Sequence, residues 1–306
     1  MEKTVIYEMK ALYRDNLRVM GYRFGKGEDT ACIVGAIRGN EIQQLYTCSI
    51  IVKMLKNLEE AGKIADGKSI MVIPSTNTYS MNVEKRFWPT DNTDINRMFP
   101  GYSLGETTQR IANGIFEKIK NFKYGIQFAS FYIPGDFIPH VRMMKTGYED
   151  TSMAMDFGLP YVVLREPRPY DTTTLNYNWQ VWGCDAFSLY AGSTEHINEE
   201  DAMKSAKAVF RFLTKRGVIE YEDYDGEMSD IILESELHPV KNNVQGILKR
   251  YKAVGDRAEC NELIAEIFDP YENEVKEQIR ANRAGKIFYV YEKPLINSNS
   301  VIYKML

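Results

Sequence analysis

The feature that most constrains the fold is a short apolar run followed by a tight turn and a segment with helical periodicity. Residues 30–34 read Thr-Ala-Cys-Ile-Val, a composition typical of a strand buried on both faces. Between Glu41 and about Gly62, apolar residues recur at the spacing of one helix face, namely Leu45, Cys48, Val52 and Leu55. Gly35 and Gly39 allow the backbone to turn sharply between the two elements. This order predicts a strand–turn–helix unit.

Two charged side chains at this junction are predicted to face a pocket. In α/β proteins, ligands bind beside the carboxyl ends of strands and the first turn of the helix that follows. Arg38 and Glu41 occupy these positions. Their spacing also allows the guanidinium and the carboxylate to pair.

Strands and helices alternate through the first two thirds of the chain. A capping box at Ser103–Glu106 predicts a helix with the apolar face Ile111, Ile115 and Ile119. Asn198 is a favourable N-cap for a helix that stops at Gly217. Residues 1–29 are expected to be a polar lead-in, and residues 131–160 an irregular stretch. Further strands are expected at residues 69–74, 124–130, 161–164 and 186–191.

The alternation predicts an α/β domain over residues 1–220. After an acidic linker at 223–230, the chain turns to short segments with β-branched and aromatic residues and turn signals between them. Three of these segments are residues 230–233, 263–268 and 286–291. They predict a small all-β domain over residues 221–306.

Composition narrows the classes of partner. The hydrophobic fraction of 44% and the charged fraction of 26% are those of an ordinary globular chain. A net charge of −4 gives no broad basic field, so no nucleic-acid partner is expected. No apolar run is long enough to span a membrane, and residues 1–8 lack the apolar stretch of a signal peptide, which predicts a cytoplasmic protein.

The four scattered cysteines are expected to be buried free thiols; they are Cys32, Cys48, Cys184 and Cys260.

Residues 35–41, Gly-Ala-Ile-Arg-Gly-Asn-Glu, resemble the G-x-H-G-x-E zinc motif of the succinylglutamate desuccinylase/aspartoacylase family, within the zinc carboxypeptidase superfamily. Residues 94–101 depart from that family's D-L-N-R-x-F-P-G only at Ile95, and Pro74 and Asn77 match its Pro-x-x-Asn stretch. The resemblance implies a zinc-carboxypeptidase-like mixed sheet flanked by helices, with a small C-terminal all-β domain of barrel-like, lipoyl type. Because no lysine lies clearly at a hairpin tip, we expect that domain to have a structural or lid role rather than a carrier role.

The resemblance also implies an anion-binding set. Asn96 and Arg97 match the residues that hold the substrate's carboxylate or carbonyl in the family, and Arg86 matches the arginine that polarises the scissile carbonyl. Arg142 matches the arginine of the family's P-Q-x-R stretch, which borders the pocket. The planar donor fork of arginine suits these tasks. The expected partner is a small anionic or N-acyl amino-acid-like ligand.

The zinc-binding side departs from the family. Arg38 replaces the first histidine ligand, Phe128 aligns with the second, and Tyr190 aligns with the catalytic glutamate of a T-x-E stretch, so only Glu41 survives. A guanidinium has no lone pair to donate, a phenyl ring offers no ligand, and tyrosine is a poor base at neutral pH. Zinc hydrolases need three protein ligands and an open position. No metal site or cofactor is therefore expected.

These substitutions favour a charge-conserving replacement. Arg38 would supply the positive partner that Glu41 loses with zinc, and a buried carboxylate without such a partner would be costly. With Arg86 and Arg97, the pocket would keep its preference for a carboxylate and lose hydrolysis. The sequence thus predicts a non-hydrolytic binder of a small carboxylate or acyl-amino-acid ligand.

Three alternatives stay open. The site could have drifted, with Arg38 pointing to solvent. The chain could be an active amidohydrolase, with a metal site rebuilt from Glu41, His140 and Glu195 or with a metal-free mechanism through Tyr190 and Arg38. It could also carry different chemistry on the same frame, since fold does not fix function.

Overall fold

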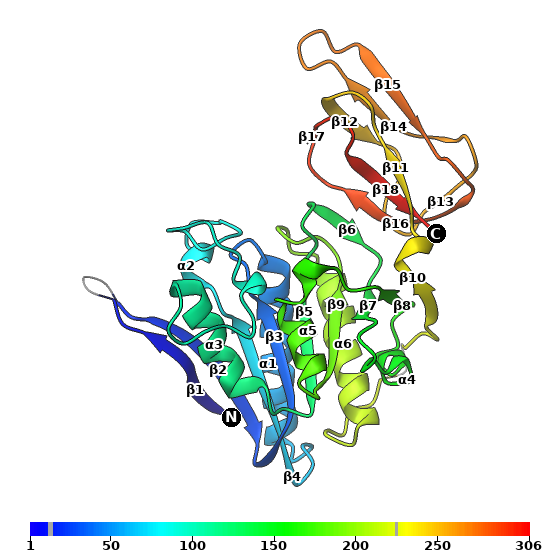
Figure 1. Ribbon diagram of the computed structural model, residues 1–306. Coiled ribbons are helices and arrows are strands. Elements are labelled where there is room, and N and C mark those ends of the chain that lie inside the picture. The colour runs from blue at the N-terminus through cyan, green and yellow to red at the C-terminus, as the bar shows by residue number, and fades with distance from the viewer. Residues whose placement is uncertain (12–14, 224–225) are drawn as a thin grey trace.

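A computed structural model of the protein describes residues 1–11, 15–223 and 226–306. Within these residues, a mixed sheet of nine strands is flanked by helices, and two smaller sheets form a C-terminal β unit at one end of it (Figure 1). This is the zinc-carboxypeptidase-like α/β fold that the sequence predicts.

The large sheet has the strand order β1-β2-β4-β3-β5-β9-β7-β8-β10. The parallel pairs in this sheet are β3–β4, β3–β5, β5–β9, β7–β8 and β8–β10. The other pairs are antiparallel. Its strands are β1 (Glu2–Met9), β2 (Leu17–Gly25), β3 (Gly27–Ala36), β4 (Gly67–Ser75), β5 (Tyr124–Phe128), β7 (His140–Met144), β8 (Tyr161–Arg165), β9 (Asp185–Tyr190) and β10 (Asp230–Leu233).

Helices cover both faces of this sheet, which explains the apolar run in β3. Ala31 and Ile33 face one hydrophobic cluster, and Cys32 and Val34 face another on the opposite side. The first cluster includes α1 (Ile42–Glu60) and α6 (Glu199–Lys215), and the second includes α3 (Thr107–Ile119) and α5 (Leu175–Val181). The shorter helical segments are α2 (Thr78–Met81), η1 (Ile95–Arg97), α4 (Thr151–Met155), η2 (Pro169–Asp171) and η3 (Glu234–Glu236).

The glycines of the β3–α1 junction are required by close packing. A Cβ atom on Gly35 would lie 2.3 Å from the Pro74 carbonyl oxygen, and one on Gly39 would lie 2.3 Å from the Lys85 carbonyl oxygen. Neither glycine has a positive φ, so their role is to let neighbouring backbone approach the turn rather than to supply an unusual backbone conformation.

The predicted polar lead-in is wrong. Within the described part of residues 1–29, β1 and β2 form an antiparallel hairpin that extends the large sheet through the pairing of β2 with β4. Its inner residues, such as Leu17 and Val19, are buried in the cluster that includes α3. The sequence signal was weak because the other face of this edge hairpin carries charged residues.

Two helix predictions need adjustment. The N-cap of α3 is Glu106 rather than Ser103. The Glu106 backbone N–H donates to Gln109 Oε1 at 3.0 Å. The buried face of α1 includes Ile51 beside Cys48 and Leu55, and in its first turns it carries the polar residues Gln43, Gln44 and Thr47. The N-cap of α6 is Asn198, as predicted.

The stretch 131–160, expected to be irregular, contains β6 (Gly135–Phe137), β7 and α4.

The C-terminal unit is a pair of packed sheets with a shared apolar core. Its strands are β11 (His238–Lys241), β12 (Gly246–Arg250), β13 (Arg257–Ala258), β14 (Leu263–Phe268), β15 (Val275–Arg280), β16 (Gly285–Tyr291), β17 (Leu295–Ile296) and β18 (Val301–Met305). The strand at 230–233, predicted to belong here, is β10 and pairs with β8 of the large sheet. The domain boundary at residue 220 stays a prediction, and residues 224 and 225 of the predicted linker lie outside the described residues.

β6 joins the two parts of the molecule. It follows β5 in the chain, yet it pairs with β16, with Phe137 opposite Tyr289. A buried cluster around these two residues also includes Tyr161 and Ile232 of the large sheet. The C-terminal unit is therefore packed onto the α/β part through a continuous apolar contact.

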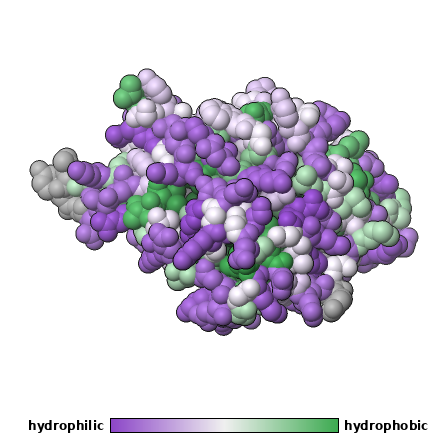
Figure 2. All heavy atoms as spheres, turned by 90° about the horizontal axis from the view of Figure 1, so that it is seen from below, coloured by the Kyte–Doolittle hydropathy of each residue, from purple (hydrophilic) through white to green (hydrophobic). Residues whose placement is uncertain are grey.

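Hydrophilic side chains dominate the face shown in Figure 2, with small hydrophobic areas between them. Among the described residues, no helix is long and apolar enough to cross a membrane. Cys32, Cys48 and Cys184 are buried free thiols, but Cys260 is exposed, contrary to the prediction.

Candidate functional site: an arginine-lined pocket

A cavity of about 540 Å³ lies where the large sheet meets the C-terminal unit. Eight cationic and three anionic side chains line it. The cationic ones are Arg38, Arg86, Arg97, Arg142, Lys145, Arg165, Arg168 and Lys304. Of the residues predicted for the site, Arg38, Arg86, Asn96, Arg97, Arg142 and Tyr190 line the cavity together. The seventh, Glu41, contacts Arg38.

Arg38 is paired as predicted, and with a second partner. Its Nη1 atom lies 3.2 Å from Glu41 Oε1, and its Nε and Nη2 atoms donate to Asp94 at 2.9–3.1 Å. The residue is only 3% exposed, so the alternative in which Arg38 points to solvent is wrong. Burial disfavours the charged form, but attraction to Asp94 and Glu41 outweighs it and raises the pKa of Arg38 above its ordinary value.

The carboxylate of Glu41 has no free acceptor position. Oε2 accepts from the backbone N–H groups of Ile37 and Arg38 at 2.8 and 3.0 Å. Oε1 accepts from Arg38 Nη1 and from Ser130 Oγ. A carboxylate has about four lone-pair positions, so this one is fully used without a metal.

The residues around Glu41 do not fit a zinc ion. Its neighbour is a guanidinium, which repels a cation and cannot ligate one. In the described part of the chain, no three His, Cys, Asp or Glu side chains cluster as metal ligands would. The rebuilt site of Glu41, His140 and Glu195 is therefore wrong. Glu195 is instead exposed and bonded to Asn40 and Lys293.

Phe128, which the sequence matches to a histidine ligand of the family, does not face the cavity. Side chains alternate across β5 and the residue after it, so Gln127 and Ala129 line the cavity while Phe128 packs in the core on the other face. Ala129 thus faces the pocket in place of Phe128. No imidazole stands at either position, so the inference about zinc is unchanged.

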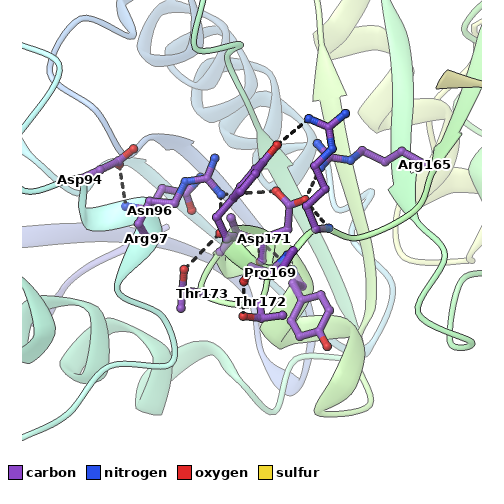
Figure 3. Close-up of polar contacts among 12 residues, drawn as sticks. Asp94, Asn96, Arg97, Arg165, Pro169, Asp171, Thr172 and Thr173 are labelled. Atoms are coloured by element: carbon purple, nitrogen blue, oxygen red, sulfur yellow. Dashed lines mark hydrogen bonds and ion pairs between the residues drawn. The ribbon is translucent and has the colours of Figure 1, made fainter. Parts of the chain in front are cut away.

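Asp94 and Asp171 organise the pocket-lining motif. Asp94 Oδ1 accepts from the backbone N–H of Asn96 at 3.0 Å, which holds η1 in the orientation that presents Arg97 to the cavity. Asp171 then pairs with Arg97 at 3.4 Å and with Arg165, as Figure 3 shows. Arg97 keeps 31% of its side chain exposed and can reach a ligand.

Tyr190 belongs to an aromatic and cationic stack. It lies opposite His140 in the β7–β9 pair, and the two rings stack at 5.2 Å between centroids. The guanidinium of Arg142 lies 5.4 Å from the Tyr190 ring and pairs with Glu234. Burial lowers the pKa of His140 to about 3, and its Nδ1 atom lies 2.8 Å from the Ile138 carbonyl oxygen, so His140 is a neutral packing residue here.

Three cations of the cavity form no ion pair with a carboxylate of the described residues: Arg86, Arg168 and Lys304. Arg168 donates to the Tyr170 hydroxyl instead. Arg86 Nη1 donates to the Phe131 carbonyl oxygen, at 3.3 Å, and burial together with Arg38 lowers the pKa of Arg86. Lys304 also lies beside Phe131, with its Nζ atom 4.9 Å from the centre of the ring.

Sequence reasoning missed several of these residues. Asp94 lies inside the matched 94–101 motif, and its partnership with Arg38 could have been proposed from there. Asp171, Arg165, Glu234 and Lys304 carry no local motif, and only the fold brings them to the cavity.

The mixed sheet and the cavity together define a carboxypeptidase-like α/β protein with a predominantly cationic pocket. The model of the succinylglutamate desuccinylase/aspartoacylase catalytic domain matches residues 28–216. The chain belongs to this family, which is one of N-acyl amino acid deacylases.

Known relatives are similar over nearly the whole chain. N-alpha-acetyl-L-2,4-diaminobutyric acid deacetylase of Halomonas elongata is 22% identical, covering 84% of this chain and 75% of the relative. A succinylglutamate desuccinylase structure from Silicibacter sp. TM1040 superposes with a TM-score of 0.81 at 18% identity, covering 99% of this chain and 92% of the other. A product-bound ectoine utilization protein of Ruegeria pomeroyi gives 0.78 at 18% identity, covering 95% and 89%. These structures support the fold.

Proposed function

We propose that the protein binds a small carboxylate ligand of N-acyl amino acid type in the arginine-lined pocket and does not hydrolyse it by zinc chemistry. The observation that carries this proposal is the arrangement of Arg38 and Glu41. The guanidinium fills the space beside Glu41, and all acceptor positions of that carboxylate are in use. A cytoplasmic location remains part of the proposal.

The charge of the cavity supports a carboxylate ligand. Eight cationic side chains face three carboxylates in the lining, and the pairing of Arg38 with Glu41 and Asp94 leaves an excess of positive charge. Arg86 has five N–H donors and one bond to a backbone oxygen. A planar guanidinium with free donors is suited to bidentate binding of a carboxylate.

Family membership favours a second candidate, an active deacylase. Its metal-free form would act through Tyr190, which lies in the cavity at the position matched to the catalytic glutamate. The relative from Halomonas elongata indicates N-alpha-acetyl-L-2,4-diaminobutyric acid as a first compound to try.

Calorimetric binding and elemental analysis on the same purified protein test the proposal. We expect N-acetyl amino acids to bind, zinc to be well below one per chain, and no hydrolysis with or without added zinc. Arg86→Ala should weaken binding about 10- to 100-fold, because a charge-assisted bond to the carboxylate is lost. Arg110→Ala, on the exposed face of α3, is the matched control. Stoichiometric zinc or hydrolysis would instead support the second candidate.

A further inference from the structure

The carboxylates that line the pocket are already neutralised by other side chains. The pairs are Glu166–Lys145, Asp171–Arg165, Asp171–Arg97 and Glu234–Arg142. The Lys304 side-chain amine has no hydrogen bond or ion pair with any residue that the structure describes. A half-buried lysine without a counter-ion is unusual, because a desolvated ammonium is costly.

Lys304 enters the pocket from β18 of the C-terminal unit. Its neighbours in the sheet are Pro239 of β11 and Tyr289 of β16, so these provide no carboxylate. Its Nζ atom lies 4.9 Å from the centre of the Phe131 ring, and the Arg142 guanidinium lies 5.9 Å from the same ring. The ammonium therefore lies between an aromatic surface and other cations.

These surroundings favour the neutral amine. Burial, followed by repulsion from Arg142, Arg168 and Arg165, lowers the pKa of Lys304 to about 8. An ordinary lysine has a pKa of about 10.4 and is less than about 1% neutral at pH 8. A desolvated lysine beside other cations is the recognised setting for an amine nucleophile.

We propose that Lys304 is a nucleophilic amine that condenses reversibly with the carbonyl carbon of an aldehyde or oxo acid, whose carboxylate is held by the arginines of the pocket. This proposal rests on the proposed function for the carboxylate-binding step. It adds a covalent step and a substrate class, carbonyl-bearing carboxylic acids. The assignment depends on the position of Lys304 and not on the zinc motif.

The step is balanced without an oxidant or reductant. The Lys304 Nζ lone pair attacks the carbonyl carbon and forms a carbinolamine. The carbinolamine then loses its hydroxyl as water, taking up one proton for that leaving group. The product is a protonated imine, whose positive charge the substrate's own carboxylate offsets. Hydrolysis reverses the step and returns the amine and the carbonyl acid.

Reductive trapping on the full chain tests the proposal. Glyoxylate, the smallest aldehyde acid, is added at pH 8 with sodium cyanoborohydride, which converts the imine into a stable secondary amine, and the labelled lysine is found by peptide mass spectrometry. We expect Lys304 to be labelled about tenfold faster than Lys53, an exposed lysine of α1. The neutral, reactive fraction of the Lys304 amine is larger at pH 8, and this gain outweighs the lower nucleophilicity of a less basic amine. The labelling rate should reach half its maximum near pH 8.

A second aldehyde separates this proposal from the proposed function. Formaldehyde has no carboxylate and reports the reactivity of the amine alone. Preferential labelling of Lys304 by both aldehydes supports the proposal. Preference with formaldehyde alone overturns the oxo acid as substrate and counts against carboxylate binding. Equal labelling of Lys304 and Lys53 by both, in a protein that still binds N-acetyl amino acids, overturns the nucleophile while the proposed function stands. Lys304→Met should remove the site, and Lys53→Met should leave it unchanged.

Discussion

At the scale of single residues, Arg38 and Glu41 form the buried pair that the sequence predicts. Arg38 places a permanent positive charge beside the Glu41 carboxylate. Asp94 then balances the charge of the guanidinium through two donor atoms. The result is a largely buried cluster of one cation and two carboxylates that holds the β3–α1 turn to the 94–101 segment.

Replacing this arginine should destabilise the protein. In Arg38→Ala, Asp94 loses its cation and Glu41 keeps only three of its donors, two of them backbone N–H groups. Breaking a buried pair costs about 3–5 kcal/mol, and the remaining donors of Glu41 favour the lower end. We expect the melting temperature to fall by about 5 °C or more, measured by calorimetry.

The matched control is Arg18→Ala. Arg18 pairs with Glu8 on the surface, where its side chain is 59% exposed, so the melting temperature should stay nearly unchanged. An Arg38→Ala protein as stable as the Arg18→Ala protein would contradict a structural role for the cluster.

The sequence predicted this pair because both partners lie within one turn. It did not predict Asp94, which lies 56 positions away from Arg38, or Lys304, which only the last strand brings to the cavity. Pairing over long separations depends on sheet order, and a single sequence does not specify that order. The residues with motif support were therefore found, and the residues placed by topology were not.

At the scale of elements, the register of β5 decides which side chain could serve a metal. The strand ends at Phe128, and the alternation of its side chains puts Ala129 on the pocket side. Neighbouring residues of a strand point to opposite faces, which is why Phe128, the position matched from the sequence, lies in the core.

This register gives a prediction about zinc. The double variant Arg38→His/Ala129→His restores two imidazoles to the pocket side, next to a Glu41 freed from its guanidinium partner. We expect it to retain about one zinc per chain after dialysis, measured by elemental analysis, because three N or O ligands then converge.

The comparison variant is Arg38→His/Phe128→His, in which the second imidazole points into the apolar core. It should bind no zinc and should unfold at a lower temperature, since a buried imidazole replaces a packed ring. Equal zinc content in the two double variants would show that the assigned register is wrong.

The elements found from sequence share one physical property. Strands buried on both faces, such as β3 and β8, give continuous apolar runs that a sequence reveals. The hairpin of β1 and β2 and the short β6 are edge or joining strands with polar residues, and their pairing partners determine that they form. Their patterns resemble loops when no partner is known.

At the scale of the whole molecule, the C-terminal unit is part of the site as well as of the fold. β16 of this unit pairs with β6, and β18 supplies Lys304 to the pocket. The sequence predicted the order of two parts, and the packed cluster around Phe137 and Tyr289 shows how closely they are joined.

A substitution at this contact should alter both stability and binding. In Gly135→Ala, the new Cβ atom would lie 2.1 Å from the Tyr289 ring, so the ring and β16 must shift. We expect a loss of about 1–3 kcal/mol in unfolding free energy and weaker binding of N-acetyl amino acids, measured by denaturation and calorimetry.

The control is Gly62→Ala, which strains the backbone but brings the new Cβ atom into no steric clash. Gly62 has a positive φ of 69° and open space around it, at the end of α1. It should lose about 1 kcal/mol of stability and keep its ligand affinity. Unchanged affinity in Gly135→Ala would mean that the position of the C-terminal unit does not matter for the pocket.

Because β18 follows every other segment that lines the cavity, the order of synthesis matters for the site. While the ribosome is still making the chain, the arginines of the α/β part can already be in place, but the wall that carries Lys304 does not yet exist. The full lining of the cavity thus forms only after β18 has been synthesised and has paired with β16.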